Sequence, residues 1–198
     1  MQKNKQNSTI STLTRILSII CGVSIIAVIF LPIWRIELDA PQYPEGLMMQ
    51  IFSNKLSGDV EIINGLNHYI GMRTLHADDF VEFTVLPYLI GVIGVIGIIA
   101  GIVRKKWFFF TWATIFLLFA VLTMVDFYIW EYNYGHNLDP SAPIQVPGMT
   151  YTPPLIGFKQ LLNFGAYSIP DIGGWIMIAV GAILTTLGIY EFKRKKHE

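Results

Sequence analysis

Long apolar runs separated by polar stretches organise this sequence. A helix needs about 20 apolar residues to cross the roughly 30 Å of hydrocarbon in a bilayer. Four segments of the 198-residue chain meet this length, at residues 13–33, 83–103, 107–130 and 172–190. The pattern therefore predicts four transmembrane helices. The remaining segments are the N-terminal 1–12, two long loops at 34–82 and 131–171, a tight turn at 104–106 and the C-terminal 191–198.

Composition supports the membrane interpretation. Hydrophobic residues make up 53% of the chain and charged residues only 14%, whereas soluble domains carry about 25% charged residues. The first apolar run is longer than the 7–15 residues typical of a cleaved signal peptide. We therefore expect this run to be retained as a helix that contacts lipid.

The basic residues predict an orientation. Lys and Arg accumulate on the cytoplasmic side of membrane proteins. Ten of the 14 basic residues fall on one side of a four-span arrangement, including the Arg104–Lys106 turn and the Lys193–Lys196 run. We therefore expect both termini in the cytoplasm and both long loops outside. The formal net charge of zero gives no reason to expect a nucleic-acid partner.

The two outer loops carry structure of their own. Leu47–Ser53 and Val60–Ile63 have strand-like composition and flank turn-forming residues, which predicts a β-hairpin. In the second loop, the apolar spacing over Phe158–Phe164 favours a short amphipathic helix. We expect the two loops to pack on each other, since each must cover its apolar residues. The predicted fold is an all-α membrane protein, a four-helix transmembrane bundle with a small extracytoplasmic cap that contains a β-hairpin.

Histidine and methionine gather in these loops. Imidazole with thioether is the ligand set that suits copper, especially Cu(I). If residues 68–76 are helical, His68 and Met72 lie one turn apart on one face and can reach a single ion. A further ligand then comes from the second loop, or from beyond a helix break. The alternative is that the methionines only pack in the cap. The candidate metal ligands are His68, Met72, His76, His136 and Met149.

Other chemistry finds little support in the sequence. Cys21, the one cysteine, lies inside an apolar run, which excludes an intramolecular disulfide and a thiolate zinc site. The sequence has no Ser-His-Asp arrangement, phosphate-binding glycine loop, HExxH or CxxCH motif. Asp126 lies in the third run. It is either a cation or proton site or an interfacial residue. We therefore expect a protein without enzymatic activity.

Four phrases in the outer loops resemble a known group of proteins. They are APQYPEGL, INGLNHYIGM, WEYNYGHNLDPSAPIQVPGM and YTPPLIGFKQLLNF. Together they resemble small polytopic membrane proteins encoded in bacterial gene clusters for nitrous-oxide reductase and its copper accessory proteins. The resemblance implies a non-enzymatic accessory protein of the bacterial inner membrane, with a partner protein in the membrane or periplasm and with copper as a candidate ligand. The alternatives are a membrane subunit of a quinol-linked oxidoreductase and a structural scaffold without a ligand.

Overall fold

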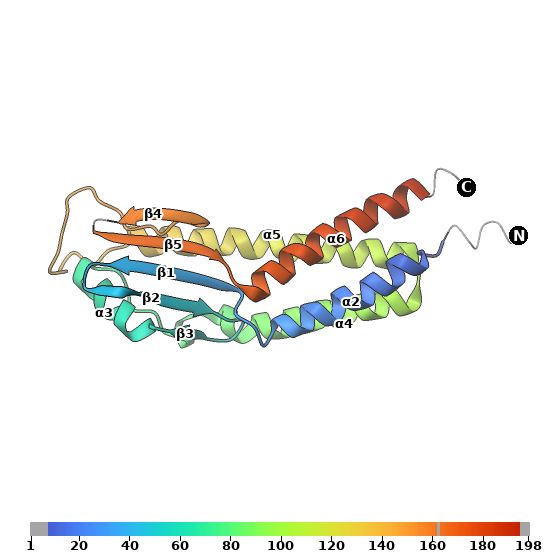
Figure 1. Cartoon of the computed structure of the whole chain (residues 1–198), viewed down its shortest axis with the longest axis horizontal. Coiled ribbons are helices and arrows are strands. Elements are labelled where there is room, and N and C mark those ends of the chain that lie inside the picture. Colours follow the sequence, from blue (N-terminus) through green and yellow to red (C-terminus); the bar gives the residue numbers. More distant parts are fainter. Residues whose placement is uncertain (1–7, 162, 195–198) are drawn as a thin grey trace, which may run out of the picture.

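Two loops far apart in the chain form one antiparallel sheet in the computed structural model, which describes residues 8–161 and 163–194 (Figure 1). The sheet has five strands in the order β3-β2-β1-β5-β4. The central pair, β1 with β5, runs from Trp34 opposite Pro170 to Asp39 opposite Gly165. The strands are β1 (Trp34–Ala40), β2 (Tyr43–Ile51), β3 (Leu56–Gly58), β4 (Gly157–Leu161) and β5 (Phe164–Pro170).

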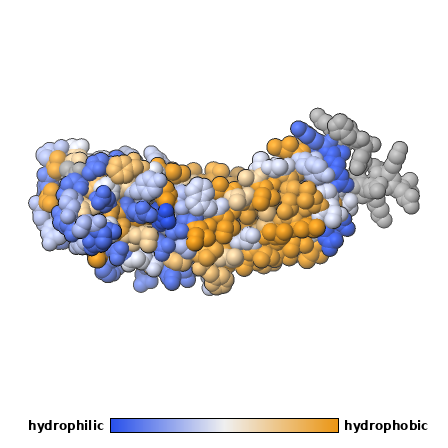
Figure 2. Space-filling view, viewed as in Figure 1, coloured by the Kyte–Doolittle hydropathy of each residue, from blue (hydrophilic) through white to orange (hydrophobic). Residues whose placement is uncertain are grey.

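Four helices extend from one end of the sheet (Figure 1). They are α2 (Thr12–Val28), α4 (Val81–Val103), α5 (Lys106–His136) and α6 (Ile172–Arg194). Among the described residues, α4, α5 and α6 are long and apolar enough to cross a membrane, whereas α2 has 17 residues. Figure 2 shows hydrophobic surface over this helical end and mixed surface over the sheet. The chain is therefore built as a multi-pass membrane protein with a polar head.

The head, which we call the cap, comprises the sheet, the end of α5, and the short helices α3 (Val60–Ile70) and η1 (Ala77–Asp79). Helix α5 has 31 residues, which at 1.5 Å per residue is about 46 Å and exceeds the hydrocarbon thickness. Phe109 and Trp112 near its start pack in the core of the bundle. Phe127, Trp130 and Tyr134 near its end pack in the core of the cap. One continuous helix thus belongs to both cores.

The cap joins the bundle without a linker. Strand β1 begins soon after α2, and β5 ends just before α6. The Ile33 N–H donates to the Ile51 carbonyl at 2.8 Å, and the Gly173 N–H donates to the Pro32 carbonyl at 2.8 Å. The side chain of Gln50 donates to Asp171 at 2.9 Å. These bonds fix the sheet to the first turn of α6 and the end of α2.

A buried carboxylate connects three helices at the end of the bundle opposite the cap. The Glu191 side chain is fully buried. It accepts hydrogen bonds from the Ser11 N–H and the Thr14 hydroxyl, both at 2.7 Å. The Lys106 amine and the Arg194 guanidinium lie 3.6 and 3.3 Å from its oxygens. Buried charges persist only when paired and hydrogen-bonded in this way, so Glu191 links α2, α5 and α6.

Two predictions inside the cap are wrong. The segment Phe158–Phe164 was expected to form an amphipathic helix, but Phe158–Leu161 lie in β4 and Phe164 begins β5, and the two strands pair as a hairpin. Leu162, which was part of the expected helix, lies outside the described residues. Ala166 and Ser168 of β5 are fully buried, and the pairing of β5 with β1 outweighs the helical spacing. The segment Val60–Ile63, expected to be a strand, is the first turn of α3. Its Ile63, Asn67 and Ile70 repeat with helical period and are buried together.

The ends of two helices also differ from the predicted span limits. Helix α5 continues six residues beyond the predicted limit of 130, because Trp130 and Tyr134 pack under the sheet instead of facing lipid. Helix α2 ends at Val28, short of the predicted 33, and three i→i−3 hydrogen bonds continue the winding to Leu31 before the chain enters β1 at Trp34. The expected contact between the two loops is confirmed: Met49 and Tyr151 lie in one hydrophobic cluster.

Glycines set the close approach of α2 to α4, which gives a matched test. A Cβ on Gly94 would lie 2.8 Å from the Gly22 carbonyl oxygen, whereas one on Gly91 would meet only a side-chain methyl at 3.6 Å. We expect Gly94→Ala to destabilise the protein by about 1–3 kcal/mol, as overpacking does. Gly91→Ala should be neutral or stabilise it by about 0.5–1 kcal/mol, since alanine favours helix. Thermal unfolding in detergent measures both, and equal effects would contradict this packing.

Candidate functional site

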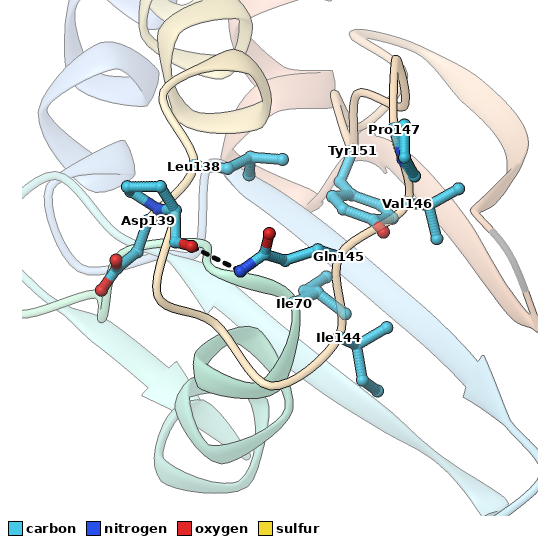
Figure 3. Close-up of a pocket in the computed structure, with 9 residues that line it drawn as sticks. Ile70, Leu138, Asp139, Ile144, Gln145, Val146, Pro147 and Tyr151 are labelled. Carbon is cyan, nitrogen blue, oxygen red and sulfur yellow. Dashed lines mark hydrogen bonds between the residues drawn. The ribbon is translucent and has the colours of Figure 1, made fainter.

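The end of the cap farthest from α2 holds a cavity of about 340 Å³ (Figure 3). Its wall comes from the end of α3 and from the loop between α5 and β4, which forms the tip in Figure 1. The lining is mostly apolar, with Ile70, Leu138, Ile144 and Val146, and it includes the Tyr151 side chain. We call this the tip pocket.

Backbone hydrogen bonds hold the tip loop against α3. The Asp139 N–H donates to the Gly71 carbonyl at 2.8 Å, and the Ile144 N–H donates to the Tyr69 carbonyl at 2.9 Å. Gly71 has a φ of +79°, and a Cβ there would come within 2.8 Å of the Asp139 carbonyl oxygen. Glycine is therefore required at the point where the loop crosses the helix end.

Side chains inside the loop keep its shape. The Gln145 amide donates to the Pro140 carbonyl (Figure 3) and also to the Ala142 carbonyl. The Asp139 carboxylate accepts from the Ser141 hydroxyl at 2.7 Å and from the Ser141 N–H at 2.8 Å. These hydrogen bonds hold the pKa of Asp139 below its ordinary value. The rim of the tip pocket thus carries one ionised carboxylate.

Tyr151 presents an unused polar group in this pocket. Its side chain is 1% exposed, and its hydroxyl has no hydrogen-bond partner among the described residues. In Figure 3 the hydroxyl points toward the loop that carries Gln145 and Val146. A buried hydroxyl without a partner costs about 1–3 kcal/mol. A ligand that brings one hydrogen-bonding group into the pocket recovers that cost.

Tyr134, a neighbour in the same core, is fully satisfied. Its hydroxyl accepts from the Asn67 amide at 2.6 Å and donates to the Arg73 carbonyl at 2.9 Å. Asn64 likewise pairs with both backbone groups of Leu75, at 2.7 and 3.1 Å. These bonds fix the segment that follows α3. The unpaired hydroxyl of Tyr151 is therefore not a general feature of this core.

Glu131 is a second polar residue without a partner. It is 1% exposed, and neither carboxylate oxygen has a hydrogen-bond partner in the part of the chain that the structure describes. It lies on α5 between Phe127 and Tyr134, on the stripe that faces the cap core. The sequence analysis missed both Glu131 and Tyr151. Glu131 could have been identified from its helical spacing, since it shares one stripe with Phe127, Tyr134 and Leu138.

The predicted metal ligands differ in burial. Met72 is buried, and Met149 packs against the same cluster, which also holds Met49. The histidines His68, His76 and His136 are exposed. Helix α3 ends at Ile70, so the expectation that His68 and Met72 share one helical face is wrong.

His136 has protein partners of its own. Its ring stacks on Tyr132, with centroids 3.9 Å apart, and its Nδ1 lies 3.0 Å from the Thr152 hydroxyl. No group of three or more His, Cys, Asp or Glu residues is placed to hold a metal within residues 8–161 and 163–194. Met72 and Met149 belong to one hydrophobic cluster, whereas the three histidines are exposed. Metal binding by the five residues stays a prediction.

Comparisons of the chain with protein-family models, with curated proteins and with solved structures found no match. The proposals that follow therefore rest on the geometry of the chain and on the resemblance of its outer loops.

The two tyrosines give opposite expected effects on stability. Tyr151→Phe removes a buried hydroxyl that has no partner, and we expect the free energy of unfolding to rise by about 1 kcal/mol. Tyr134→Phe leaves the Asn67 amide and the Arg73 carbonyl unpaired, and we expect a loss of about 1–3 kcal/mol. Chemical denaturation of the detergent-solubilised protein measures both. A destabilised Tyr151→Phe variant would mean that its hydroxyl already has a partner.

Proposed function

We propose that the chain is a non-enzymatic accessory protein of the bacterial inner membrane, and that its cap docks a partner protein at the tip. The observation that carries this proposal is the tip pocket with its unpaired Tyr151 hydroxyl. The apolar side chains of Tyr69, Ile144 and Val146 around it are 55%, 47% and 41% exposed. Exposed apolar groups around a pocket are typical of protein interfaces.

The proposed topology has four spans with both termini in the cytoplasm. Three hydrogen bonds of i→i−3 type extend α2 as far as Leu31, so the helical segment from Thr12 covers the length of a short span. Helix α2 also packs along α4 through Gly22 and Gly94. The basic turn Arg104–Lys106 and the basic end of α6 lie at the end of the bundle opposite the cap, which supports the orientation.

The chemistry of the tip defines the kind of partner. An apolar side chain that carries a hydrogen-bonding group fits a pocket with apolar walls and one free hydroxyl. The ionised Asp139 on the rim favours a neighbouring positive charge on the partner. The resemblance described above makes the periplasmic and membrane proteins of nitrous-oxide reductase gene clusters, and their copper, the first candidates to test.

The orientation is testable with two exposed positions. Single cysteines at Asn54 and Lys193 are introduced into a Cys21→Ser variant, and intact cells are treated with a membrane-impermeant maleimide. We expect labelling at Asn54, in the turn between β2 and β3, and no labelling at Lys193 until the membrane is permeabilised. The opposite pattern would invert the topology and place the cap in the cytoplasm.

Tip docking is testable by photocrosslinking in cells. A photoreactive amino acid at Ile144 should crosslink to one defined protein, whereas the same amino acid at Phe158, which is 63% exposed on β4, should not. Adding Val146→Asp should reduce the crosslink by about tenfold or more, because a charge enters an apolar contact. Equal crosslinking from Ile144 and Phe158, or no effect of Val146→Asp, would refute tip docking.

A further inference from the structure

A second, larger cavity of about 640 Å³ lies where the bundle meets the cap. Its walls come from α4, α5 and α6, and residues of β1 and β2 close its outer end. Farther from the cap α4 and α5 are tightly packed, since Trp112 donates to the Ile93 carbonyl at 2.9 Å and its ring abuts Gly97. The cavity is thus confined to the half of the bundle nearest the cap.

The lining is apolar apart from a few groups, and two of these are carboxylates. Glu82, in the first turn of α4, and Asp126, on α5, both line the cavity, and their charges repel one another. Neither forms a salt bridge among the described residues. A large apolar cavity with two uncompensated negative charges is complementary to an amphiphile with a positive head.

The depths of Glu82 and Asp126 in the proposed membrane placement define the amphiphile further. Asp126 lies 20 residues beyond Lys106, and Glu82 lies 22 residues before Arg104. At 1.5 Å per residue these separations are about 30 and 33 Å, which puts both carboxylates at the outer edge of the hydrocarbon. Leu117, deep in the cavity, lies nine residues before Asp126, or about 14 Å, roughly the depth of one leaflet.

We propose that this cavity binds one phospholipid of the outer leaflet, with an acyl chain between α4, α5 and α6 and a headgroup ammonium against Glu82 and Asp126. The acyl chain matches the apolar walls in polarity and in length. The ammonium supplies the positive charge that these two carboxylates lack within the described residues. The inference rests on the membrane placement given above and is independent of docking at the tip.

Native mass spectrometry of the protein released from nanodiscs tests the proposal. The nanodiscs contain phosphatidylethanolamine and phosphatidylglycerol in equal amounts. We expect the wild type to retain one phosphatidylethanolamine, in about tenfold preference over phosphatidylglycerol. The double variant Glu82→Gln/Asp126→Asn should lose this preference. The control Glu45→Gln/Glu61→Gln, which removes two exposed carboxylates of the cap, should keep it.

A matched pair of glycine substitutions on α6 tests whether the cavity binds an acyl chain. Gly181 lines the cavity, and a Cβ there meets only side chains at 3.7 and 3.9 Å, so Gly181→Leu fits and fills the space. Gly188 lies two turns further on, with a similar 3.7 Å contact. Gly181→Leu should abolish retention of either lipid, and Gly188→Leu should not.

Several results would overturn the proposal. The first two are a wild type without retained lipid and equal retention of the two lipids. The others are a Glu82→Gln/Asp126→Asn variant that keeps the preference, and a lipid-free dimer in which a second copy fills the cavity. Correct cysteine labelling and tip crosslinking in a protein without bound lipid would overturn this inference alone.

Discussion

The pairing of β1 with β5 is the contact on which the cap depends. It joins two loops whose paired residues, Trp34 and Pro170, are separated by most of the chain. Each strand is also nearly continuous with a helix of the bundle, α2 before β1 and α6 after β5. The ladder therefore sets where both helices leave the sheet. Without it, the sheet would divide into a meander of β1, β2 and β3 and a separate β4–β5 hairpin. An isolated two-stranded hairpin is marginally stable in water.

Helix α5 packs against this sheet and completes the core of the cap. Phe127 packs edge-on against Trp34, with centroids 5.4 Å apart, and Trp130 stacks on Tyr134 at 4.8 Å. The same helix carries Trp112 in the bundle core. Helix α5 is continuous from the end of the bundle opposite the cap to the end of the cap, and it packs in both cores. The cap is therefore coupled to the helical bundle, and a partner bound at the tip, as proposed, would be held at a fixed distance from the helices.

The sequence predicts the helical half better than the cap for a physical reason. Long apolar runs have few alternatives to a helix, because backbone groups in lipid must be satisfied within the segment. In the cap, Phe158 and Leu161 have a spacing that fits a helix, yet β5 is selected by a partner strand over 120 residues away. No local pattern reports such a partner. The same limit applies to the candidate site: Tyr151 and Ile70 meet only after the tip loop has docked on α3.

The hydrogen bonds and ion pairs of Glu191 have a consequence for biosynthesis. Its carboxylate receives hydrogen bonds from Ser11 and Thr14, which are made 180 and 177 residues earlier. At roughly 5–20 residues per second, the first helix waits about 10–35 s for its acceptor. Any chain released before the last helix is complete leaves the Lys106 amine without this counter-ion. The end of the bundle opposite the cap therefore closes only after residue 191 has been made.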